Sequence, residues 1–369
     1  MSLEAARAYV GLFDPFRLRL ARQFSGLRKS ELAKKLDKTP AAITQYESGA
    51  KVPSAATFAA MALALGFPVE FFARDGRRVT DFNLGQAWYR SLRSTRQLDR
   101  DRAETQALLV IELAEAMQRH VRMPELNLPQ SLHVPEIADR ETIEQAALEV
   151  RKSWQVPDGP IASMVRLLEA NGVLVTRCRV ECREVSAFSR YSRKGPVVVI
   201  DADQEGLDRV RFNAAHELGH LVLHSDVEPA NRILERQADQ FAASFLMPKH
   251  LIRDHLPARL NWTKFAELKQ TWGVSVASLL YRARELGRIS LATYQRGMKR
   301  MSAAGQRKNE SEFPISGSES ISLFRRAMEI IEKKGITVSA LAKEARLPTD
   351  FVAEVVASHD RPPLPALHL

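Results

Sequence analysis

The stretch FNAAHELGHLVLH, residues 212–224, is the most informative part of this sequence. Residues four apart lie on one face of a helix, so His216 and His220 can bring two imidazole nitrogens to one metal ion. Glu217 projects about 100° round the helix from His216, where its carboxylate can reach a water on the metal rather than the metal itself. The spacing therefore predicts a metal-activated water with a general base beside it.

A second helical stretch, LERQADQFAASFLMP at residues 234–248, supplies the rest of the predicted site. Its apolar residues recur at helical spacing, and Glu235 and Asp239 stand four apart on the other face. A catalytic zinc ion keeps three protein ligands and an open position for water, and Glu235 is the candidate third ligand. Asp239, one turn on, can accept the free N–H of a ligand histidine and fix its tautomer. The alternative is that both carboxylates form a solvated face of an amphipathic helix.

The two stretches together resemble the gluzincin metallopeptidases, and more narrowly the ImmA/IrrE family. The resemblance covers roughly residues 140–300 and extends to Trp272-Gly273-Val274-Ser275 and to the run SAFSRYSRKGPVVVI before the metal helix. It implies an α+β zincin-like domain over residues 136–300 that binds Zn²⁺. The implied zinc ligands are His216, His220 and Glu235, with Glu217 as the base and Asp239 behind a ligand.

The same resemblance implies how a substrate is held. Zincins bind an extended peptide along an edge strand, and Val197 to Ile200 fills that position in this sequence. The implied substrate is a regulatory protein, in particular a repressor, or the chain itself. Candidate donors to the oxyanion of the reaction are His224, Tyr191 and Arg193, and His224 is equally well explained as a hydrogen-bonded residue on the metal face.

Residues 16–72 carry a different pattern, in which short helices are separated by turn residues. Thr39 is a good N-cap and Pro40 suits the first helical position, so we expect a helix from Pro40 to about Ser48, ended by Gly49. The pattern resembles the XRE-type Cro/repressor helix-turn-helix domain. This resemblance implies a five-helix domain over residues 10–75, whose second motif helix enters the major groove of a double-stranded DNA operator.

The DNA contacts implied by this resemblance fall into two groups. Base reading is expected at the start of the second motif helix, where Gln45 can pair with adenine and Thr44 and Ala41 can touch a thymine methyl. Phosphate contact is expected from Arg28 and Lys29, and the alternative is that some of these basic residues only solvate the surface. The candidate DNA-binding residues are Arg28, Lys29, Thr39, Pro40, Ala41, Thr44, Gln45 and Lys51.

The remaining segments are predicted to be helices and linkers. Residues 76–135 are predicted to form a helical connector with the pattern WYRSLRSTRQLDRDRAETQALLVIELAEAMQRHV. Such a helix can pack two subunits together or space the DNA-binding domain from the metal domain, and the homodimer contact is favoured because such repressor domains bind paired half-sites. Residues 301–320 read as a polar linker and residues 321–369 as a small helical module. The module has a helix-turn-helix rhythm, although a packing role is favoured. A tail on a polar linker is also long enough to close the metal cleft.

Composition agrees with a soluble intracellular protein of several domains, and the helical patterns and resemblances above predict a mainly α fold with an α+β zincin-like domain. The chain has 369 residues, of which 45% are hydrophobic, and a net charge of +10 that suggests a polyanion partner. No stretch is long and apolar enough to span a membrane, and the N-terminus lacks a secretion signal, so we expect a cytoplasmic protein with no membrane partner. Cys178 and Cys182 are expected to be reduced, and a C-x-x-x-C pair without companion ligands is a weak zinc signal.

These observations predict a DNA-binding transcription regulator with a zinc-dependent peptidase domain that cleaves a regulatory protein or itself. The alternative is a DNA-binding repressor or an antitoxin whose metal domain is a non-catalytic sensor. The intact Glu217 argues against the alternative, because a pure binder has no evident need for a base beside the metal.

Overall fold

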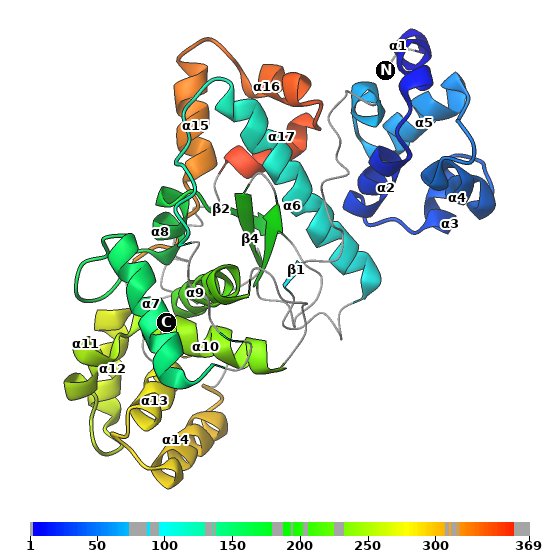
Figure 1. Ribbon diagram of the computed structural model, residues 1–369. Coiled ribbons are helices and arrows are strands. Elements are labelled where there is room, and N and C mark those ends of the chain that lie inside the picture. The colour runs from blue at the N-terminus through cyan, green and yellow to red at the C-terminus, as the bar shows by residue number, and fades with distance from the viewer. Residues whose placement is uncertain are drawn as a thin grey trace, which may run out of the picture.

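The protein is mainly helical with one small sheet, as the sequence predicts. Figure 1 shows the computed structural model. The structure describes residues 3–73, 87–88, 96–129, 135, 138–178, 187–192, 195–201, 206–224, 232–306, 310, 315 and 317–357. Among these residues, no helix is both long and apolar enough to cross a membrane.

The N-terminal part of the chain is a bundle of short helices. Asp14 caps α2 by accepting the Phe16 N–H at 2.9 Å, and Thr39 caps α4 by accepting the Ala42 N–H at 3.2 Å. Gly49 ends α4 with φ of 77°, as expected. The elements are α1 (Leu3–Tyr9), η1 (Val10–Leu12), α2 (Pro15–Phe24), α3 (Lys29–Lys35), α4 (Pro40–Ser48), α5 (Ala55–Leu65) and η2 (Val69–Phe72). The stretch FPVEFFAR, residues 67–74, is expected as the last of the five helices, but its described residues contain only the short 3₁₀ helix η2, and α1 is an additional helix.

The sheet has the strand order β1-β3-β4-β2. Its strands are β1 (Ala87–Trp88), β2 (Leu174–Cys178), β3 (Ala187–Ser192) and β4 (Gly195–Asp201). β4 pairs with β2 in parallel and with β3 antiparallel, so it lies inside the sheet. The expectation that Val197 to Ile200 is an edge strand is therefore wrong. The short loop between β3 and β4 favours a hairpin, and the parallel strand β2 then covers the remaining edge of β4.

Each face of the sheet packs into a different hydrophobic core. Phe188, Val197 and Val199 join the core that contains α6 (Gln97–Gln118). Val198 and Ile200 join the core around the two helices that carry His216, His220 and Glu235, which are called the metal helices here. This division follows from the alternation of side chains along a strand. The sheet thus lies between α6 and α9 (Leu207–Leu223), as Figure 1 shows.

Helix α6 is shorter than the sequence pattern predicts and is covered within its own chain. The expected helix begins near Trp88, but Trp88 lies in β1 and the helix starts at Gln97. Five consecutive residues of α6, from Ala107 to Ile111, are buried. The elements packed on α6 include α2, β2, β4 and two C-terminal helices, α15 (Leu323–Glu332) and α16 (Val338–Ala345). The buried middle of this helix is therefore an intramolecular contact rather than a free surface for a second subunit.

The metal helices form the centre of the remaining helical layer. Gly219 lies where α9 meets α10 (Arg232–Leu246), and a Cβ on Gly219 would stand 3.2 Å from Ala238 Cα and 3.2 Å from Phe241 Cβ. This close approach brings Glu235 and Asp239 next to the histidines. Around the pair lie α7 (Arg140–Ser153), α8 (Met164–Ala170), α11 (Lys249–Ile252), η4 (Arg253–His255), α12 (Trp262–Trp272), α13 (Val276–Glu285) and α14 (Leu291–Ala303).

The C-terminal helices pack on α6 and on the N-terminal bundle. They are α15 (Leu323–Glu332), α16 (Val338–Ala345) and α17 (Thr349–Val356). The ring of Phe351 lies 5.3 Å from the ring of Phe24 of α2, and Glu344 forms an ion pair of 2.7 Å with Arg119. The exposed side of α17 carries Asp350 and Glu354, charges that DNA repels. The described helices of the module, α15–α17, therefore pack within the chain on α6 and the N-terminal bundle rather than over α9 and α10 (Figure 1), and residues 358–369 of the tail expected to close the metal cleft lie outside the described residues.

Candidate metal centre

Two histidines of α9 and one glutamate of α10 point their donor atoms at one another. The Nε2 atoms of His216 and His220 lie 3.0 Å apart. Glu235 places Oε2 at 3.4 Å from His216 Nε2 and Oε1 at 3.5 Å from His220 Nε2. Both histidines are buried, with 3% and 1% of their surface exposed. The three predicted ligands are therefore assembled, and their donor atoms all lie within 4.8 Å of one another.

The donor set fits a zinc ion. Tetrahedral zinc with bonds of about 2.0–2.2 Å to nitrogen and oxygen separates its ligand atoms by roughly 3.3–3.5 Å. The three donor distances, 3.0, 3.4 and 3.5 Å, lie close to that separation. Two imidazoles and one carboxylate are also a ligand set that zinc takes in catalytic sites, where a fourth position stays open. His216, His220 and Glu235 would hold the metal here.

Asp239 orients the first histidine. Its Oδ1 lies 2.9 Å from His216 Nδ1, which turns Nε2 toward the other ligands. Burial of the His216 ring disfavours its cation, but the hydrogen bonds to Asp239 and Glu235 and the charge of Glu217 outweigh burial and raise the pKa of His216 to about 9. A metal ion must displace this proton, so metal binding at the site releases protons and weakens in acid.

A second hydrogen-bonded chain orients the other histidine. His220 Nδ1 lies 3.1 Å from His224 Nδ1, and His224 Nε2 lies 2.9 Å from Gln237 Oε1. If His220 Nε2 binds a metal, the Nδ1–H of His220 donates a hydrogen bond to His224 Nδ1, and the Nε2–H of His224 donates one to Gln237 Oε1. Burial lowers the pKa of His224, which agrees with a neutral ring. The geometry favours a hydrogen-bonded role for His224 over an oxyanion role.

The proposed base contacts a hydroxyl from the sheet. Ser189 of β3 donates its Oγ–H to Glu217 Oε2 at 2.6 Å, and both residues are buried, with 0% and 3% of their surface exposed. A charge-assisted bond of this length fixes the carboxylate rotamer. Ser189 thus holds one oxygen of Glu217.

The candidate DNA-binding residues lie together on the outer side of the helical bundle. Thr39, Pro40, Ala41, Thr44 and Gln45 are exposed along the first turns of α4, and Arg28 and Lys51 are exposed beside them. A buried ion pair between Arg22 of α2 and Glu47 holds α4 in place from behind. Lys29 is half-buried, and its Nζ lies 3.4 Å from Thr44 Oγ1 and 3.6 Å from Glu47 Oε2. Lys29 is therefore partly engaged within the bundle.

Comparison with protein families gives two matches at these two places. Residues 18–72 match a family model described as a helix-turn-helix, and residues 168–284 match the IrrE N-terminal-like domain. The chain is a helix-turn-helix domain fused to an IrrE-like domain. No curated protein matches the chain. The IrrE-like match contains β2 to β4, both metal helices and Ser189, whereas α6 and the C-terminal helices lie outside both matches.

The other expected oxyanion donors of the IrrE-like domain have different outcomes. Tyr191 lies two residues after Ser189 on the same strand and is 40% exposed. Partial burial raises the pKa of its hydroxyl, so Tyr191 keeps its proton and stays a hydrogen-bond donor near neutral pH. Arg193 lies outside the described residues. Tyr191 is thus the described candidate that the fold leaves accessible.

Sequence reasoning missed two residues of the IrrE-like domain that contact the site. Gln237 stands between the candidate ligand Glu235 and Asp239, and its burial, which sets it apart, is visible only in the structure. Ser189 belongs to a strand whose alternation places Ala187, Ser189 and Tyr191 on one face. The pairing of that face with Glu217 depends on how the sheet packs on α9, which a strand pattern alone does not give.

Proposed function

We propose that the IrrE-like domain is a zinc-dependent peptidase and that the chain is a DNA-binding regulator that cleaves a regulatory protein, or itself. When bound, zinc supplies Lewis-acid polarisation of a carbonyl and makes a water acidic enough to act near neutral pH. The protein's own groups supply the rest of the chemistry. A regulator that binds the chromosome acts in the cytoplasm, which we infer as its location.

Glu217 is the group that moves protons in this proposal. It accepts a proton from the attacking water and later gives that proton to the leaving amine, so one water is added across the broken peptide bond. Ser189 holds Glu217 Oε2 at 2.6 Å, which fixes the orientation of the carboxylate that takes the proton. Asp239 and the His224–Gln237 pair keep His216 and His220 in the tautomers whose unprotonated nitrogen is Nε2, the atom that would bind zinc.

The observation that carries the proposal is the buried pair of Ser189 and Glu217 beside the ligand group. A metal sensor needs only the three ligands, and a buried carboxylate that binds no metal is costly unless it has a task. The second carboxylate is fixed by its own donor and lies next to His216 in the chain. This arrangement supports a base rather than a passive neighbour.

The direct test uses the zinc-loaded protein and the Glu217→Gln variant, each incubated with repressors encoded in neighbouring genes. Mass spectrometry of the products should show cleavage of a repressor, or of the chain, only with Glu217 present. Zinc should be retained by both proteins. Equal cleavage by both would point to a contaminating protease, and zinc retention without cleavage of any of these proteins would favour the sensor or antitoxin.

We further propose that the helix-turn-helix domain binds an operator as a pair of subunits. The exposed start of α4 fits one half-site, and two such half-sites about 34–36 Å apart need two copies of the domain. Because the middle of α6 is buried within the chain, the contact between subunits lies elsewhere on the protein. Sedimentation with and without operator DNA tests this pairing.

A further inference from the structure

The outer edge of β3 is occupied by a short strand from another part of the chain. β3 forms its hairpin with β4 on one side, and on the other side it pairs antiparallel with β1. The register places Ala87 opposite Arg190 and Trp88 opposite Ser189. β1 comes from the connector between the helix-turn-helix domain and α6, far from β3 in the sequence.

This edge runs beside the proposed base. Ser189, the residue opposite Trp88, is the one whose hydroxyl holds Glu217 Oε2 at 2.6 Å. An extended peptide added to β3 here would form main-chain hydrogen bonds with the strand that touches Glu217. The opposite edge of β3 is already closed by β4, so β1 takes the edge that a peptide could use.

We propose that Ala87–Trp88 is a substrate-like strand that the chain lays across its own proposed catalytic site, and that a peptide substrate binds by displacing it. The inference rests on the proposed function, because it assigns the regulation of that site. The antiparallel direction is one in which an extended peptide can add to a sheet edge. A pair of only two residues on each strand is weak by itself, so exchange with a longer peptide is feasible.

β1 is linked through the chain to the helix-turn-helix domain on one side and to α6 on the other. The connector starts from the helix-turn-helix domain and ends at α6, and α2 of that domain is fixed to α6 by Arg17, whose Nη1 lies 2.7 Å from both oxygens of Glu112. The connector that carries β1 therefore joins two elements, the helix-turn-helix domain and α6, that contact each other through Arg17 and Glu112.

The test compares Trp88→Pro with Trp88→Ala in the zinc-loaded Glu217→Gln protein, which cannot consume the probe. Proline removes the backbone N–H that a strand donates, whereas alanine keeps it. The probe is a fluorescein-labelled peptide of residues 84–92, LGQAWYRSL, and fluorescence anisotropy measures its binding. We expect the proline variant to bind the peptide about tenfold more tightly than the alanine variant, because the β1–β3 pairing that competes with the peptide is weakened. Equal affinity in the two variants would overturn the proposal.

A second measurement needs no proline and covers the case in which that variant misfolds. An excess of the same unlabelled peptide is added to the Glu217→Gln protein, and hydrogen exchange is followed along the chain. The amides of residues 87–88 should exchange faster, while the β2–β4 pair stays protected. Unchanged exchange at residues 87–88 with the peptide bound would refute displacement.

The outcomes separate this inference from the proposed peptidase. With Glu217 restored, a reduced and carboxymethylated α-lactalbumin probe should be cleaved faster by Trp88→Pro than by Trp88→Ala. Tighter peptide binding by Trp88→Pro without cleavage of any probe would support the proposal that β1 competes with substrate and would reject the proposed peptidase activity. Cleavage by both variants at one rate, with no gain in binding, would keep the peptidase and reject the strand competition.

Discussion

Arg211 of α9 forms a buried ion pair with Glu319, a residue of the segment that leads to the C-terminal helices. The Nε of Arg211 lies 2.7 Å from Glu319 Oε1. Glu319 also accepts the backbone N–H groups of Met164 at 3.0 Å and Val165 at 2.9 Å, at the start of α8. A segment expected to be a free polar linker is therefore fastened to the helix that carries both ligand histidines.

The first prediction concerns this ion pair. Glu319→Gln should lower the free energy of unfolding by about 3–5 kcal/mol, because it leaves the Arg211 guanidinium buried without its counter-charge. Denaturation with urea measures the loss. The double variant Arg211→Met/Glu319→Gln should recover part of it, and two fully additive losses would show that the pair is not coupled.

The second prediction concerns the metal ligands. His216→Ala or Glu235→Ala should reduce bound zinc well below one equivalent, since a three-ligand site depends on each ligand. Glu217→Gln should keep its zinc. Metal analysis after dialysis provides the readout, and full zinc in the Glu235→Ala protein would reject that residue as a ligand.

The third prediction concerns the hydroxyl beside the base. Ser189→Ala should lower kcat for peptide cleavage by about tenfold or more and leave KM and zinc content unchanged, because Glu217 loses its fixed orientation. Ser244→Ala is a matched control: Ser244 is also buried and donates to a carboxylate, Glu144, at 2.7 Å, but in a structural cluster. An equal loss of kcat in both variants would mean that Ser189 acts only through stability.

The fourth prediction concerns DNA. Binding should weaken steeply with salt, and Arg28→Ala should weaken all sequences alike and flatten the salt slope by roughly one unit. Gln45→Ala should instead relax the preference at one base pair by about 1–3 kcal/mol. Fluorescence titrations of the full chain at several salt concentrations separate the two effects. A uniform loss in the Gln45→Ala protein would remove it from base reading.

The fifth prediction concerns pH and the start of α15. Burial raises the pKa of the Glu169 carboxyl above 4.5, although the N–H groups of Leu323 and Ser322 partly oppose this shift. A raised folded-state pKa means that Glu169 favours folding below about pH 4.5 and loses that contribution as the pH rises through the folded value. The melting temperature of Glu169→Gln minus that of the wild type should therefore increase as the pH rises from about 4 to about 8. A constant difference across that range would contradict this.

The sequence predicted local features well and long-range contacts poorly. The caps at Thr39 and Gly49 and the pair His216 and His220 follow from spacing within single helices, and the structure contains them. Glu235 lies on a second helix, α10, and only the packing of α10 on α9 brings it to the histidines. The position of β4 inside the sheet was missed, because a run of valines reads the same at an edge and in the middle. Ser189 and Trp88 were missed because their partners lie far away in the sequence, in α9 and β3.

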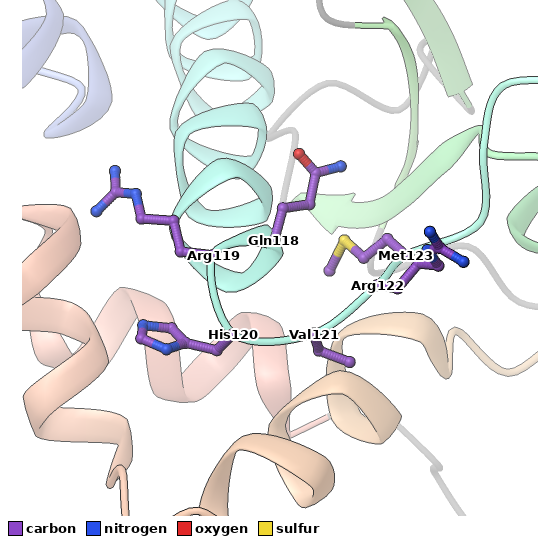
Figure 2. A pocket seen from close by; sticks show the side chains of 6 residues that line it. All are labelled: Gln118, Arg119, His120, Val121, Arg122 and Met123. Carbon is purple, nitrogen blue, oxygen red and sulfur yellow. The ribbon is translucent and has the colours of Figure 1, made fainter.

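The C-terminal end of α6 is a second place where a long-range contact could not be predicted from the sequence. Figure 2 shows the side chains of Gln118 to Met123 around an open pocket of about 430 Å³ where α6 gives way to a loop. Arg119 and His120 both contact Glu344 of α16, at 2.7 Å each. In the sequence these residues look like a basic helix end. Their partner lies in the C-terminal module, so local charge patterning does not show that the module docks there.

Because of helix α6, the helix-turn-helix domain and the IrrE-like domain are not structurally independent of the rest of the chain. It shares one core with the N-terminal bundle, one face of the sheet and the C-terminal helices. A chimera that exchanged the helix-turn-helix domain at the connector would leave Glu112 without Arg17 and Phe351 without Phe24. Transplanting either domain into another protein would therefore require α6 and α15–α17 to be transferred with it.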